Sequence, residues 1–264
     1  MTASDRLKEL VTLNAPFWAG EAEVFRTYWN WQGRSPETDK TWLSYQCFKE
    51  MWDTGLGDKK LGLCHGLLEQ LTEQFPKVDR GVDRHAVLDI AEGLTSEFAH
   101  YCAFADVYDA LCAPGEPTLN PDLLETWPAE QKLAEMRREH RATHGEIGLR
   151  ATRFTEGGYC RLYAEGMALK GRGGIDDKIA EACVRVYEDE FDHMLKGVAG
   201  LDDGNMTDAD WDLLCRLTVE QLKLRIHMRN DQFGKPLSEA RIAEIFRGEI
   251  EPVAFDWAGA QLAA

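Results

Sequence analysis

The chain has 264 residues and a formal net charge of -16, with 44% hydrophobic and 29% charged residues. This composition is typical of a globular protein and is too apolar for a disordered chain. A surface this acidic repels phosphate backbones and anionic lipid headgroups, so we expect neither nucleic acid nor a membrane as a partner.

Apolar residues recur at helical spacing nearly throughout the chain, and no segment shows the alternation typical of a strand. In chain order, the pattern predicts helices over residues 16–31, 41–75 with an interruption near 55–57, 84–111, 129–170, 175–199, 208–230 and 238–247. Asp83 and Thr207 are residue types that cap helix N-termini, and the glycine-rich turn 171–174 ends the longest helix. We predict a single all-α domain over residues 1–264.

The cysteines and the N-terminal residues bear on the cellular compartment. The seven cysteines are odd in number and include no Cys-x-x-Cys pair, which argues against a disulfide framework or a zinc knuckle. Most lie in apolar helical stretches, as reduced and buried thiols do. The first ten residues are polar, and no apolar run reaches the roughly 18–20 residues that span a bilayer. We expect a cytoplasmic protein.

Two predicted helices each carry a glutamate and a histidine three residues apart: Glu97 with His100, and Glu190 with His193. Residues three apart lie on one helix face, so each pair can bind a single metal ion. Apolar residues share both faces, and a carboxylate among them is unfavourable unless it is neutralised, paired or bound to metal. The two pairs are therefore candidate metal ligands.

Glu156 is the predicted partner of the second pair. Glu156 and Glu190 are each about 16 residues from the turn at 171–174, so antiparallel helices would bring them level. Glu165, nine residues after Glu156, would point to the opposite face. Cys160, one turn after Glu156, and Tyr163 on the same face are candidate catalytic residues.

Glu69 is the predicted partner of the first pair. Their levels match poorly, because Glu69 is close to the loop at 76–82 while Glu97 is farther from it, a mismatch of roughly 12 Å along the helices. The alternatives for this ligand are His65, Asp58 and Glu73.

The order of these residues resembles the ferritin-like di-iron carboxylate superfamily, over about residues 61–199: Glu69, Glu97-x-x-His100, Glu156 and Glu190-x-x-His193. That superfamily includes multicomponent monooxygenases, acyl desaturases, aldehyde-deformylating oxygenases, ribonucleotide reductase small subunits, rubrerythrins and ferritins. The resemblance implies a four-helix bundle at about 58–200 with additional helices at both ends. It also implies that these six residues bind two Fe ions, or a Mn/Fe pair, that react with O2.

The expected function is an O2-dependent di-iron monooxygenase or oxidase that hydroxylates, desaturates or N-oxygenates a small organic molecule. Its partners would be that substrate, O2 and an electron donor protein or reductant, and a homodimer is an open possibility. One alternative is a haem-oxygenase-like helical oxidase with ligands drawn from His65, His193 and His227. The other is a non-enzymatic binding or scaffold protein whose Glu and His residues form structural ion pairs.

Overall fold

The computed structural model describes residues 5–52, 64, 66–201 and 206–258, and this part of the chain is helical without strands. The helices are α1 (Asp5–Trp29), α2 (Pro36–Trp52), α4 (Leu67–Gln74), α5 (Arg84–Ala110), α6 (Pro128–Glu156), α7 (Arg161–Met167), α8 (Gly174–Val198), α9 (Asp208–Gln232) and α10 (Glu239–Phe246). Short 3-10 turns lie at Phe75–Lys77, Pro121–Leu123 and Gly158–Cys160. The all-α prediction is confirmed. No helix among the described residues has the length and apolar character needed to cross a membrane.

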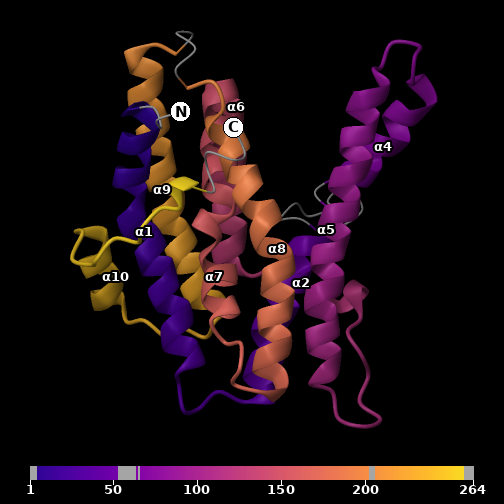
Figure 1. Ribbon diagram of the computed structural model, residues 1–264, viewed down its shortest axis with the longest axis vertical. Helices are drawn as coiled ribbons and strands as arrows, with labels where there is room; N and C mark the ends of the chain where they lie inside the picture. The colour runs from indigo at the N-terminus through magenta and orange to yellow at the C-terminus, as the bar shows by residue number, and fades with distance from the viewer. Residues whose placement is uncertain (1–4, 53–63, 65, 202–205, 259–264) are drawn as a thin grey trace.

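Four helices are consecutive neighbours around the middle of the molecule. α2 packs on α5, α5 on α8 and α8 on α6, while α9 packs against α6 and α1. Figure 1 shows the long helices running along the vertical axis, with α4 and the first part of α5 projecting away from the others. α2 lies before the bundle predicted at 58–200 and nevertheless packs directly on α5.

The predicted helix starts are confirmed where a side chain caps them. Asp83 accepts hydrogen bonds from the backbone N–H groups of His85 at 2.8 Å and Ala86 at 3.2 Å. Thr207 and Asp210 form a reciprocal capping box at the start of α9. These caps satisfy backbone donors that have no partner within the helix.

The first helix begins earlier than predicted. α1 starts at Asp5 and continues through Pro16, which the sequence pattern had placed at the helix start. Leu10, Val11 and Asn14 are buried on the preceding turns, and Asn14 Nδ2 donates to Thr218 Oγ1 of α9 at 3.2 Å. Tertiary packing thus extends the helix across a residue that lacks a backbone donor.

The prediction of a single helix over 129–170 is wrong, because α6 ends at Glu156. Gly158, Tyr159 and Cys160 have φ values of 51°, 42° and 54°, and α7 begins only at Arg161. A Cβ on Gly158 would overlap the ion pair between Arg225 and Glu21. At this break the backbone therefore lies directly against a buried ion pair, and the left-handed Tyr159 and Cys160 that form it are unfavourable by ~1–2 kcal/mol each.

Candidate metal centre

A cavity of about 30 Å³ lies among α2, α5, α6 and α8 and is lined by a carboxylate from each of these helices. The four carboxylates are those of Glu50, Glu97, Glu156 and Glu190, and His193 lines the cavity with them. A space of that size is enough for one or two waters or small ions. We call it the ligand cavity.

The first half of the site is formed by Glu50, Glu97 and His100, all of them buried. One potential ligand atom from each lies within 4.8 Å of the others. His100 Nδ1 is 3.4 Å from Glu97 Oε2 and 3.8 Å from Glu50 Oε2. Two donors that bind one ion at about 2.1 Å are about 3.0–3.4 Å apart, so small side-chain adjustments would place all three on one ion.

The second half of the candidate site is Glu156, Glu190 and His193, which line the ligand cavity. Among the described residues, only the ligand atoms of Glu50, Glu97 and His100 lie within 4.8 Å of one another, so the second set is more widely spaced. A Cβ on Gly157, the residue after Glu156, would lie 3.3 Å from Glu190 Oε2, so the two glutamates are level as the sequence indicated. Burial, followed by the charge of Glu97, raises the pKa of Glu190 to about 6, while His193 acts in the opposite direction. The two halves therefore share one electrostatic environment.

Two buried atoms of this centre have no hydrogen-bond partner: His100 Nδ1 and Glu190 Oε2. Leaving a buried polar atom unpaired is unfavourable by about 1–3 kcal/mol, and more for a charged group. Burial alone would lower the pKa of His100, but the neighbouring Glu97 and the charge of Glu50 raise it to about 9. A cation bound between the carboxylates would satisfy both atoms, and carboxylate and imidazole donors suit iron and manganese.

Asp189 fixes the orientation of the His100 ring. Its Oδ2 is 2.9 Å from His100 Nε2 and accepts a hydrogen bond from Ser96 Oγ at 2.6 Å. Partial burial acts to raise the pKa of Asp189, but the hydrogen bonds from Ser96 and His100 lower it overall. In the metal-free protein the raised pKa of His100 keeps a proton on each ring nitrogen, with Nδ1 facing Glu97. A metal ion at Nδ1 would replace that proton, while the Asp189 carboxylate would keep the other proton on Nε2, the arrangement that metal-binding histidines use.

Replacing Asp189 with asparagine is expected to weaken metal binding by about 10- to 100-fold, because the ring loses the carboxylate that orients it. Asp192→Asn is the matched control, since Asp192 pairs with Lys196 at 2.8 Å on the exposed side of α8. Competition against a metal-sensitive chelating dye would give both affinities. Equal affinities for the two variants would contradict the role of Asp189.

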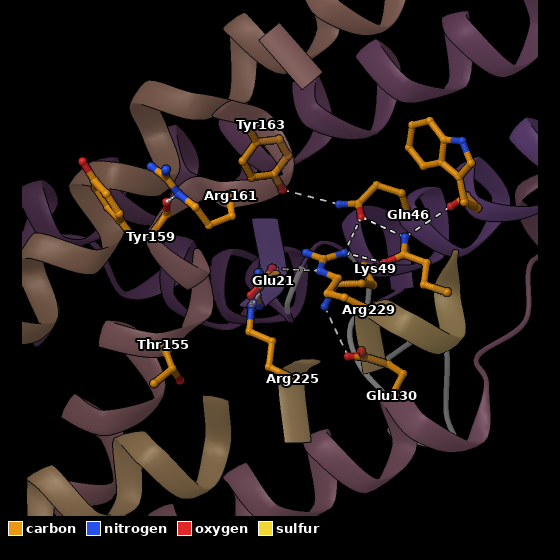
Figure 2. A network of polar contacts seen from close by, with 12 residues as sticks. Glu21, Gln46, Lys49, Glu130, Thr155, Tyr159, Arg161, Tyr163, Arg225 and Arg229 are labelled. Atoms are coloured by element: carbon orange, nitrogen blue, oxygen red, sulfur yellow. Dashed lines mark hydrogen bonds and ion pairs between the residues drawn. The ribbon is translucent and has the colours of Figure 1, made fainter. Parts of the chain in front are cut away.

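A chain of buried polar groups leads from Glu50 through Gln46 to α1 and α9. Figure 2 shows the part that links Gln46, Arg229 and Glu21. Gln46 Nε2 donates to Glu50 Oε1, and Gln46 Oε1 accepts from Arg229 Nη1 at 2.9 Å. Because Arg229 can only donate, the orientation of the Gln46 amide is fixed with its N–H groups toward Glu50. Glu21 lies between Arg225 at 2.8 Å and Arg229 at 3.3 Å. This network holds the Glu50 carboxylate in place.

Cationic side chains are unusually close to the ligand cavity. Lys49, Arg137 and Arg229 line it and are no more than 9% exposed. Lys49 pairs with Glu130 at 3.2 Å, and Arg137 Nη2 donates to Thr155 Oγ1 at 3.4 Å. The site is therefore a polar and charged interior, in contrast with an apolar pocket.

The predicted position of Glu69 opposite Glu97 is wrong, and Glu50 takes its place as the candidate ligand. Glu69 and its alternative Glu73 are exposed on α4, whereas Glu50 of α2 contributes the carboxylate beside Glu97. The physical reason is the difference in level between Glu69 and Glu97 along their helices, which keeps Glu69 away from the Glu97 carboxylate. The alternatives His65 and Asp58 lie outside the described residues.

The other predicted residues have distinct environments. Tyr163 lines the ligand cavity, and its hydroxyl accepts a hydrogen bond from Gln46 Nε2 at 3.4 Å. Cys160 is buried but is not among the residues that line the cavity, and burial followed by the charge of Glu190 raises the pKa of its thiol. Glu165 pairs with Arg26 at 2.7 Å, and the His227 ring packs on Phe246 with centroids 5.4 Å apart.

Glu50 was not predicted because α2 lies farther from α5 in the chain than α4 does, although α2 carries a signal for it. Trp42, Leu43, Gln46, Cys47 and Glu50 are all buried and recur at three- and four-residue spacing. A glutamate in register with such a stripe faces the interior. Asp189 and Arg137 give no comparable signal, because charged residues surround them in the sequence.

Comparison with known proteins gives no family for this chain: no family model, no curated protein and no solved structure matches it.

Proposed function

We propose that this chain is an O2-dependent di-iron oxidoreductase built on a ferritin-like bundle of α2, α5, α6 and α8. The supporting observation is that Glu50, Glu97, Glu156, Glu190 and His193 line one cavity, and that the sixth residue, His100, lies beside it with Nδ1 3.4 Å from Glu97 Oε2. One glutamate from each of two helices, with a Glu-x-x-His pair from each of two others, is the ligand set of di-iron carboxylate bundles. The substrate would be a small organic molecule, and an electron donor would be needed for turnover.

Different residues would have different roles in such a site. Four carboxylates would neutralise two divalent ions, with one Glu-x-x-His pair for each ion. Asp189 sets the tautomer of His100, and Gln46 restrains Glu50. Two iron ions held there would activate O2 and supply the oxidising power. The buried surroundings, with Glu50 at 4% and His100 at 0% exposure, limit access of water to that chemistry.

The test is an anaerobic titration of the metal-free protein with Fe(II), followed by exposure to air. We expect about two irons per chain and, after air, the near-ultraviolet charge-transfer absorption of ferric iron bound by carboxylates. Glu97→Ala and Glu190→Ala should each abolish binding of at least one ion. Metal-free chains that stay metal-free under these conditions, and that both substitutions destabilise, would instead support a scaffold held by structural ion pairs.

A further inference from the structure

A second and larger cavity, of about 620 Å³, adjoins the ligand cavity and shares Glu97, Arg137, Glu156 and His193 with it. We call this cavity the cleft. Its volume is within the range of small-molecule sites, about 300–1,000 Å³. Any molecule in the cleft would therefore lie next to the metal ligands.

The lining of the cleft is basic although the protein is strongly acidic. Among the described residues, five cationic side chains line it: Arg137, Arg138, Arg141, Arg153 and Lys196. Only Asp89 adds a carboxylate beyond the metal ligands Glu97 and Glu156. On a chain with a net charge of -16, this concentration of positive charge would attract anions to this face.

Once two metal ions are bound, the buried side chains behind the cleft would also carry more positive than negative charge. Four cations are at least nine-tenths buried around the centre: Lys49, Arg137, Arg225 and Arg229. Outside the metal ligands, the equally buried carboxylates close to them are Glu21, paired with Arg225 and Arg229, and Glu130, paired with Lys49. Two divalent ions would match the four ligand carboxylates, so two positive charges remain. Buried charge without a partner is strongly unfavourable.

Arg137 is the cation best placed to receive an anion. It lines both cavities, is 8% exposed, and its Nε is buried without a hydrogen-bond partner. Burial lowers the pKa of Arg137 from its usual value, although the nearby Glu156 acts in the opposite direction. A guanidinium presents paired N–H donors that match the two oxygens of a carboxylate or phosphate. Leu67, Ala134 and Leu149 provide an apolar wall in the same cleft.

We propose that the substrate is an organic oxyanion, with its carboxylate or phosphate bound by Arg137 and its apolar part lying along the wall formed by Leu67, Ala134 and Leu149. This inference rests on the proposed function, because the surplus of positive charge arises when two metal ions occupy the site. Arg137 is thus a substrate-binding residue, while Arg138, Arg141 and Arg153 at the exposed part of the cleft steer anions toward it.

The experiment is calorimetric titration of the anaerobic protein loaded with two Fe(II) ions, with its metal content measured first. The probes are octanoate, octyl phosphate and benzoate, each compared with the neutral amide or alcohol and the cationic amine of the same skeleton. We expect the anions to bind at least tenfold more tightly than their neutral or cationic counterparts. The comparison between octanoate and octyl phosphate identifies which oxyanion is preferred.

Arg137→Gln should weaken binding of the best anion by about 10- to 100-fold, as expected for loss of charge-assisted hydrogen bonds, while two irons remain bound. Arg185→Gln, which removes an exposed arginine of α8 outside the cleft, should leave binding unchanged. Failure to load two irons would contradict the proposed function itself. With two irons bound, an absence of preference for anions in the unmodified protein, or an unchanged affinity in Arg137→Gln, would overturn the inference.

Discussion

Glu50→Gln is expected to reduce bound iron from two ions to at most one per chain. The affinity for the ion beside Glu97 and His100 should fall at least about 100-fold relative to the unmodified protein. Loss of a partner behind a metal ligand weakens binding by about 10- to 100-fold, and loss of a ligand carboxylate should do at least as much. The amide cannot supply the negative charge that Glu50 places beside Glu97 and His100. Metal analysis of the purified variant after Fe(II) loading gives the count directly.

Glu69→Gln is the matched control, because Glu69 was the ligand indicated by the sequence pattern and its side chain is exposed on α4. We expect it to retain two irons. The metal-free Glu50→Gln protein should melt no lower than the unmodified metal-free protein, since the substitution removes one of several clustered negative charges. Loss of iron from Glu69→Gln and retention in Glu50→Gln would reverse our assignment.

Glu21→Gln is expected to lower the free energy of unfolding by about 3–5 kcal/mol. Glu21 is 1% exposed and is the carboxylate that pairs with both Arg225 and Arg229, which are equally buried. Removing one partner of a buried ion pair leaves the other charge without compensation. Urea denaturation of the metal-free protein measures the change separately from any effect on metal binding.

Glu23→Gln, two residues along the same helix, is the control for this prediction. Glu23 pairs with Arg241 at 2.7 Å, but both side chains are more than a quarter exposed. Such a pair contributes less than about 1 kcal/mol. Similar losses for Glu21→Gln and Glu23→Gln would show that the buried ion pair does not stabilise the fold as its geometry indicates.

Local signals in the sequence were sufficient for the helical class and for several helix starts. Asp83, Thr207 and Ser238 cap α5, α9 and α10 through side-chain hydrogen bonds to nearby backbone N–H groups. These contacts span only two or three residues, so the sequence contains all the information that determines them. The level relation between Glu156 and Glu190 also followed from chain length on each side of one turn.

Long-range contacts determine the features that the sequence pattern missed. The break at Gly158–Cys160 accommodates Arg225 and Glu21, which are about 65 and 140 residues away in the chain. The assignment of Glu50 depends on α2 packing against α5, a pairing that no local pattern specifies. Asp189 contacts Ser96 and His100 of α5, about 90 residues away in the chain, so its own sequence context gave no indication of these contacts.

Anomalous diffraction at the iron absorption edge, from crystals of the Fe(II)-loaded protein, tests most directly whether the six proposed ligands from four helices hold two metal ions. We predict two peaks within about 4 Å of each other. One should lie within bonding distance of Glu50, Glu97 and His100, and the other within bonding distance of Glu156, Glu190 and His193. A single peak, or iron bound away from these residues, would contradict the account.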